Sequence, residues 1–131
     1  MVTTVPNSVQ HLDRALAILG VLDRFFKGPQ VPEEILGLKR SATESDIRSS
    51  RNNLARLCHP DYCPGGQSLA KAATQLVNAA FDMISGKRPI GNWPRLEVSP
   101  GTVHMLRETI LEHKPVILTL HNRYTTTAFL S

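Results

Sequence analysis

The sequence predicts a mainly α protein, in which a helical hairpin follows an amphipathic helix and precedes a small αββ extension. Two observations support this prediction. Apolar residues recur at spacings of three and four in several stretches, and prolines and glycines separate those stretches. We expect residues 1–30 to form an N-terminal helical extension, residues 31–88 the central domain, and residues 89–131 a C-terminal extension. The chain has 131 residues, of which 41% are hydrophobic and 20% are charged, so it has room for one ordinary folded domain.

The first predicted helix begins at Ser8, which can cap it, and ends before Gly28 and Pro29. Lys27 supplies a basic residue in its last turn. A single apolar stripe runs along this helix, so that face has to pack on something. Packing on the protein's own domain is the favoured interpretation, and docking on a partner or a membrane surface is the alternative. The stripe consists of Val9, Leu12, Leu16, Leu19, Leu22 and Phe26.

The second predicted helix has a clear start and a clear end. Glu33 to Leu38 is expected to form a short helical turn before it. Thr43 is a good N-cap, and Asp46 lies where an acidic residue completes a capping box. The helix should run over residues 44–58, because Pro60 disfavours helical backbone at the residue before it.

A third helix is predicted over residues 68–85, after a loop with Pro64, Gly65 and Gly66 at its tip. This helix and the preceding one should form an antiparallel hairpin, because the loop is short and the alanine-rich face permits a close approach. The apolar stripe consists of Leu69, Ala72, Ala73, Leu76, Val77, Ala80, Met83 and Ile84.

The C-terminal extension begins with an irregular stretch rich in proline and glycine, in which Trp93 is expected to lie against an apolar surface. A serine followed by proline at residues 99–100 predicts the start of a helix that runs to about residue 113. Residues 116–120 and 124–130 are rich in β-forming residues and predict a hairpin, which completes the αββ extension.

An ordered set of motifs lies between residues 34 and 88, and its most specific member is the tripeptide His59-Pro60-Asp61 between two correctly spaced helices. The other segments are Glu34 to Leu38, Ser41 to Glu44, the apolar Ile47, Leu54 and Ala55, Val77 to Ser85, and the pair Lys87 and Arg88. Together they resemble a J-domain, the helical module that stimulates Hsp70 ATPases. The resemblance covers about two fifths of the chain.

The resemblance implies a co-chaperone that performs no bond chemistry itself. Such a module docks its second helix and its tripeptide on an ATP-bound Hsp70 and favours the hydrolysis-competent state. The carboxylate of Asp61 would accept hydrogen bonds from an arginine of the partner, and Pro60 would fix the backbone at the helix exit. A basic row on the helix would steer the module towards an acidic groove. The Hsp70-binding residues implied are His59, Pro60, Asp61, Arg48, Arg51 and Arg56.

The sequence departs from the family pattern along the second helix and at one position of the third. Arg51 stands where an aromatic residue is usual, and Asn52 and Asn53 stand where basic residues are usual. Thr74 replaces an aromatic residue early in the third helix. These departures support an alternative function, in which the chain is a structural subunit of a larger assembly. It would dock through its N-terminal helix and its C-terminal hairpin, with weakened or lost Hsp70 coupling.

Other classes of function are not favoured by the sequence. Cys58, His59, Asp61 and Cys63 lie close together, but structural zinc sites usually combine ligands from two separated elements, so we expect no metal and no cofactor. No nucleophile and base can be paired by spacing, so we expect no enzyme. A net charge of +4 with 5% aromatic residues does not favour nucleic acid.

The chain is expected to lack a transmembrane segment, because its longest apolar run, Ala15 to Leu22, is far shorter than the roughly 20 residues that a span needs. Two cysteines are too few for a disulfide framework, which favours an intracellular, reducing compartment. Whether that compartment is cytoplasmic or mitochondrial stays open at this point.

Overall fold

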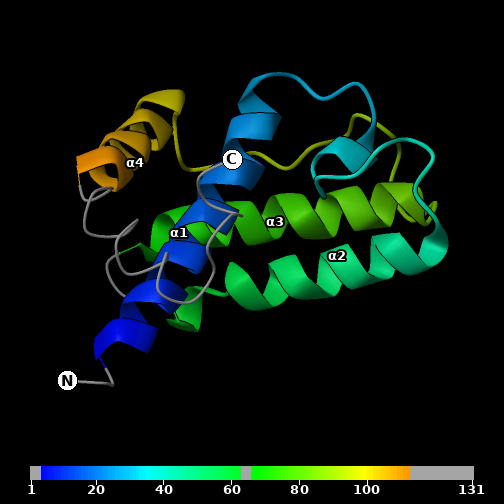
Figure 1. Ribbon diagram of the computed structural model, residues 1–131. Helices are drawn as coiled ribbons and strands as arrows, with labels where there is room; N and C mark the ends of the chain where they lie inside the picture. Colours follow the sequence, from blue (N-terminus) through cyan, green and yellow to red (C-terminus); the bar gives the residue numbers. More distant parts are fainter. Residues whose placement is uncertain (1–3, 63–65, 113–131) are drawn as a thin grey trace.

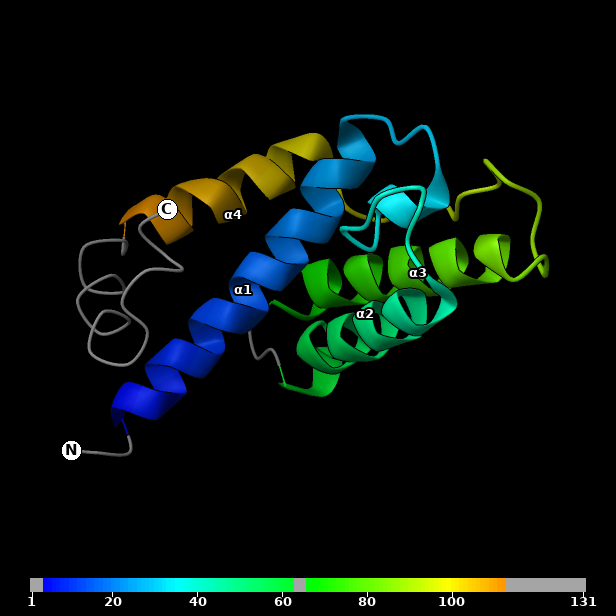
Figure 2. The ribbon, with the colours of Figure 1, turned by 45° about the vertical axis from the view of Figure 1, so that its right-hand side comes forward.

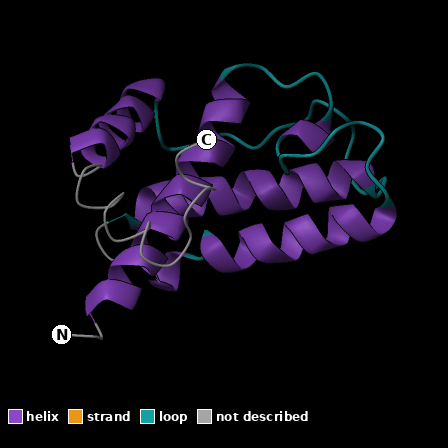
Figure 3. Cartoon of the chain, in the orientation of Figure 1, coloured by secondary structure: helices purple, strands orange, loops and turns teal. Residues whose placement is uncertain are grey.

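The computed structural model describes residues 4–62 and 66–112, and their regular elements are all helical (Figures 1 and 3). The prediction of a mainly α fold is therefore confirmed. The hairpin expected at residues 116–130 lies outside the described residues, so only the helix of the expected αββ extension is found. In chain order the elements are α1 (Thr4–Phe26), the 3-10 helix η1 (Pro32–Glu34), α2 (Glu44–Leu57), the 3-10 helix η2 (Pro60–Tyr62), α3 (Gln67–Ile84) and α4 (Pro100–Glu112).

Helix α1 ends where it was expected to end but begins earlier. The helix starts at Thr4, so the prediction that Ser8 caps it is wrong. Pro6 lies in the first turn, where backbone N–H groups have no partner within the helix and a proline is tolerated. At the other end Gly28 has φ of 87° and its N–H donates to the carbonyl of Phe25 at 3.0 Å, an arrangement that favours glycine.

Helix α2 is bounded as the sequence predicts. The N–H of Asp46 donates to Oγ1 of Thr43 at 3.1 Å, and the N–H of Thr43 donates to Oδ2 of Asp46 at 3.3 Å. These two bonds form the expected capping box. The helix ends at Leu57, and the N–H of the next residue, Cys58, closes the last turn on the carbonyl of Leu54 at 2.8 Å.

Helix α3 is the central element of the fold. It runs antiparallel to α2, and the two helices lie side by side in both ribbon views (Figures 1 and 2). It also contacts α1, η1 and η2. Its small side chains let these neighbours approach closely, and Leu76 and Val77 are completely buried among them. The buried residues of α3 are Ala70, Ala72, Ala73, Leu76, Val77, Ala79, Ala80 and Met83.

Helix α1 packs on its own domain, which confirms the favoured interpretation of its apolar stripe. It crosses α3 and also contacts α2 and α4. Of the expected stripe, Leu12 and Leu22 are buried and Phe26 is exposed, whereas Ile18 and Val21 are buried although the stripe did not include them. Ile18, Val21 and Leu22 belong to the same buried cluster as residues of α2 and α3 and as Val103 of α4. The two flanking helices and the hairpin therefore share one hydrophobic core.

The irregular stretch after α3 is held against α1. Trp93 packs edge-on against Phe25, with ring centroids 5.7 Å apart, which agrees with the expectation that this tryptophan lies on an apolar surface. Helix α4 then begins as predicted, and the N–H of Thr102 donates to Oγ of Ser99 at 3.3 Å. In Figure 2, α4 lies along the C-terminal half of α1.

Candidate functional site

The tripeptide His59-Pro60-Asp61 lies at the exit of α2 and presents two polar side chains to solvent. The His59 side chain is 48% exposed and that of Asp61 is 80% exposed. The backbone N–H of Asp61 donates to Nδ1 of His59 at 3.2 Å, which places the proton of a neutral imidazole on Nε2. Oδ2 of Asp61 lies 3.7 Å from the same Nδ1. The two side chains are thus adjacent, and the carboxylate is open to an external donor.

The carbonyl groups at the end of α2 are bonded by side chains from two other helices. Oγ1 of Thr74, on α3, donates to the carbonyl of Cys58 at 2.9 Å. Nη1 of Arg14, on α1, donates to the carbonyl of Arg56 at 3.1 Å and lies 3.5 Å from that of Leu57. The last carbonyls of a helix lack partners within it, and a cation is favourable at this negative end. Three consecutive carbonyls immediately before His59 are therefore fixed from outside α2.

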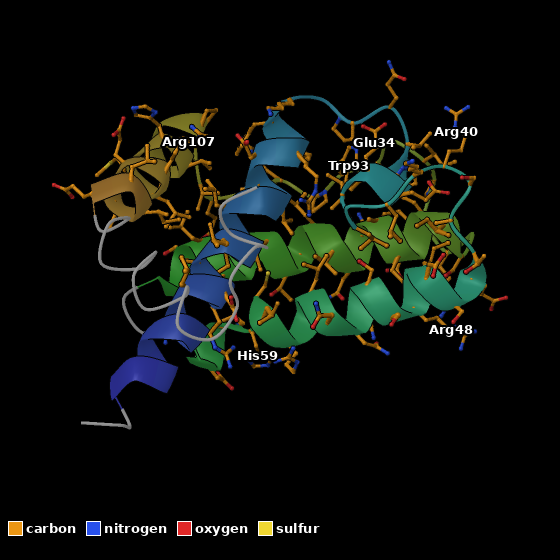
Figure 4. All side chains as sticks on the ribbon, viewed as in Figure 1. Glu34, Arg40, Arg48, His59, Trp93 and Arg107 are labelled. Carbon is orange, nitrogen blue, oxygen red and sulfur yellow. The ribbon has the colours of Figure 1, made fainter. Side chains whose placement is uncertain are left out.

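The basic residues expected to bind a partner do not form one patch. Arg48 is exposed at the start of α2, where Nη2 contacts Oε1 of Glu44 at 3.0 Å. Arg56 is exposed near the other end and donates to Oδ1 of Asn53 at 2.8 Å. Figure 4 shows Arg48 and His59 at opposite ends of the helix. Only Arg56 therefore lies beside the tripeptide.

The third expected basic residue, Arg51, faces α3. Its guanidinium carbon lies 5.1 Å from the centroid of the Phe81 ring, within the range of a cation–π contact. Nη1 donates to Oδ1 of Asn52 at 3.2 Å, whereas Nε is buried and has no hydrogen-bond partner in the described part of the chain. Arg51 is thus half-buried and lies against Phe81 of α3, and its part in binding a partner stays a prediction.

A groove of about 560 Å³ runs between α1 and α2 and ends beside the exit of α2. Arg14, Asp13 and Leu16 line it from α1, and Arg56 and Asn53 line it from α2. Sequence reasoning missed Arg14 because 42 residues separate it from Arg56, and no local pattern links the two. Arg14 directly precedes the apolar run Ala15 to Leu22, and its sequence neighbours gave no sign of this partner.

The described residues also bear on two other kinds of site, a metal centre and a membrane-spanning helix. Within residues 4–62 and 66–112, no group of three or more histidine, cysteine and acidic side chains is placed to hold a metal ion. None of the helices in these ranges combines the length and the apolar composition that crossing a bilayer requires. What the helix end does present to solvent is the carboxylate of Asp61 and the imidazole of His59.

The comparisons with known proteins agree with this geometry. The family model of the DnaJ domain matches residues 34–90, which run from η1 through α2, the tripeptide and α3. This part of the chain is a DnaJ domain. The chain is 35% identical over 52 residues to a protein called Chaperone protein DnaJ from Ruminiclostridium cellulolyticum, and 38% identical over 52 residues to those of Caldicellulosiruptor bescii and Deinococcus proteolyticus.

The similarity is confined to this domain. Each match covers 40% of the chain, and the chain spans only 13–16% of the length of these relatives. No solved structure gives a significant match. Helices α1 and α4 lie wholly outside the matched region, although Leu22 of α1 and Val103 of α4 belong to the same hydrophobic core as α2 and α3.

Proposed function

We propose that this protein is a J-domain co-chaperone, which binds an Hsp70 and stimulates its ATP hydrolysis through His59, Pro60 and Asp61. The observation that carries the proposal is the exposed tripeptide at the end of α2, within a stretch that matches the DnaJ domain. The proposal needs no catalytic group in this chain, because a module that binds one state of its partner more tightly shifts the partner towards that state.

The geometry of the tripeptide supports a role for each of its residues. Asp61 offers an exposed carboxylate, to which an arginine of the Hsp70 can donate two hydrogen bonds in a bidentate pair. Pro60 has a fixed φ and begins η2, directly after His59. The backbone that carries the Asp61 carboxylate is therefore restricted in its orientation relative to α2. The Nδ1 of His59 accepts a hydrogen bond from the Asp61 backbone N–H, which holds the imidazole next to the carboxylate.

Single-turnover ATP hydrolysis by an Hsp70, with and without this chain, tests the proposal. We expect the wild-type chain to accelerate hydrolysis and His59→Gln or Asp61→Asn to remove the acceleration. His104→Gln is the matched control, because His104 is also an exposed histidine but lies on α4. Absence of stimulation by the wild type, or equal stimulation by His59→Gln, would contradict the proposal.

One observation favours a second function, that of a structural subunit in a larger assembly with weakened or lost Hsp70 coupling. Of the three arginines on α2, Arg48 is paired with Glu44 and Arg51 is turned towards Phe81, which leaves little free positive charge along the helix. Steering towards an acidic groove would then be weak. Purification of the tagged chain separates the two functions. An Hsp70 released by ATP supports the co-chaperone, and a fixed complex unaffected by ATP supports the subunit.

A further inference from the structure

A residue outside the tripeptide contacts the end of α2 from which the tripeptide extends. We infer that Arg14 of α1 is a positioning residue for the tripeptide, although α1 precedes the matched region of the chain. This inference rests on the proposed function for its consequence in ATP hydrolysis, but its structural part can be tested without a partner.

The argument begins with the backbone at the end of α2. A helix leaves its last carbonyls without internal partners, and such an end frays unless something else bonds them. Here the carbonyl of Cys58 accepts from Thr74, and the carbonyls of Arg56 and Leu57 lie at 3.1 and 3.5 Å from Nη1 of Arg14. Arg14 therefore bonds the last turn from the side that α3 does not reach.

Charge adds to the hydrogen bonds. The C-terminal end of a helix carries a partial negative charge, so a guanidinium that donates to its carbonyls is bound more strongly than a neutral donor. Arg14 is half-buried in the groove between α1 and α2, which reduces screening by solvent. The next residues along the chain from these carbonyls are Cys58 and His59, so motion of the last turn would move the imidazole directly.

A second arginine of α1, Arg24, also donates to a backbone carbonyl of another element, and comparison with it shows what is specific to Arg14. Arg24 donates to the carbonyl of Ile35 through Nη2 at 2.9 Å and through Nε at 3.3 Å. Burial lowers the pKa of the Arg24 guanidinium, while Cys58 and Asp23 act in the opposite direction. Arg24 therefore ties α1 to the turn after η1, whereas Arg14 ties α1 to the tripeptide end of α2.

The experiment compares three full-length variants. Arg14→Met keeps most of the apolar stem and removes the donors at the end of α2. Arg24→Met makes the same chemical change on the same helix but removes hydrogen bonds to Ile35 and none of the bonds from Arg14 and Thr74 to the end of α2. Arg14→Lys keeps a cation that can reach the carbonyls. Each variant is measured by amide hydrogen exchange at Cys58 and Asp61 and by titration of Hsp70 ATPase stimulation.

In Arg14→Met we expect exchange at the Cys58 and Asp61 amides to be about three- to tenfold faster than in the wild type, the change that follows from losing roughly one ordinary hydrogen bond, because the bond from Arg14 to Arg56 is exposed. The concentration for half-maximal stimulation should rise by a similar factor, while the maximal rate stays near that of the wild type. Arg24→Met should leave both quantities within twofold, even if it lowers the melting temperature more. Arg14→Lys should recover most of the wild-type behaviour.

Equal effects of Arg14→Met and Arg24→Met on exchange would overturn the inference, since they would show a general loss of packing. Unchanged exchange in Arg14→Met would also overturn it. If the wild-type chain gives no stimulation at all, the proposed function fails, and the exchange measurement alone still decides whether Arg14 positions the tripeptide.

Discussion

The guanidinium of Arg51 lies over the ring of Phe81, 5.1 Å from its centroid, and joins the two helices of the hairpin at a position where the family usually has an aromatic residue. The contact brings a cost, because Nε of Arg51 is buried without a hydrogen-bond partner among the described residues. A cation–π contact at a partly exposed site contributes about 0.5–1 kcal/mol. A buried donor left unsatisfied costs about 1–3 kcal/mol, so the cost is the larger of the two.

Arg51→Met is therefore expected to raise the free energy of unfolding by about 1 kcal/mol, since a thioether fills the same space and makes its own contact with the ring. Urea denaturation measures the change. Arg48→Met is the control, because Arg48 is exposed and pairs with the equally exposed Glu44 one turn away. It should change stability by less than about 0.5 kcal/mol. A loss of stability in Arg51→Met would show that the cation–π contact outweighs the unsatisfied donor.

The capping box at the start of α2 gives a second prediction. Thr43→Ala removes the oxygen that accepts from the N–H of Asp46 and should lower the free energy of unfolding by about 1 kcal/mol. Ser45→Ala in the same turn is the control, because Ser45 is exposed within the helix and does not occupy the cap position. Thermal or urea unfolding distinguishes them. Equal effects of the two variants would mean that the capping oxygen contributes little here.

The ion pair between Asp23 and Arg107 gives a third prediction, because it joins α1 to α4 across 84 residues of sequence. Both side chains are about two-thirds buried, so screening by solvent is incomplete. A double-mutant cycle with Asp23→Asn and Arg107→Met should give a coupling free energy of about 0.5–1 kcal/mol. The coupling free energy should be smaller at about 1 M salt than at about 0.05 M salt, because the Debye length falls to roughly 3 Å at the higher concentration. No measurable coupling at low salt would contradict the prediction.

The elements that sequence reasoning predicts well are those with local start and stop residues. Thr43 and Asp46 fix the start of α2, and Ser99 fixes the start of α4, because each bond spans three residues. The start of α1 was missed, since Ser8 resembles a cap but Pro6 in the first turn allows the helix to begin earlier. A pattern of local preferences cannot choose between two acceptable starting points.

The parts of the site that sequence reasoning could not predict depend on the relative placement of helices. The tripeptide and its exposure follow from the motif and the helix end. The bond from Arg14 to the carbonyl of Arg56 and the turn of Arg51 towards Phe81 depend instead on where α1 and α3 pack against α2. Thr74 illustrates the same limit: its identity was noted as a departure, but its bond to the carbonyl of Cys58 required the hairpin geometry.

The shared core gives the last prediction, which concerns whether α1 is an appendage or a part of the folding unit. Leu22 of α1 is completely buried in the cluster that also contains residues of α2 and α3. Leu22→Ala should therefore lower the free energy of unfolding by about 2–5 kcal/mol, through lost transfer free energy and the cavity left behind. Unfolding should remain a single cooperative transition when followed both by Trp93 fluorescence and by far-UV circular dichroism. Met105→Ala, at a side chain 69% exposed on α4, should change stability by less than about 0.5 kcal/mol. Two separated transitions, or a Leu22→Ala variant as stable as the wild type, would show instead that residues 31–88 fold independently of the N-terminal helix.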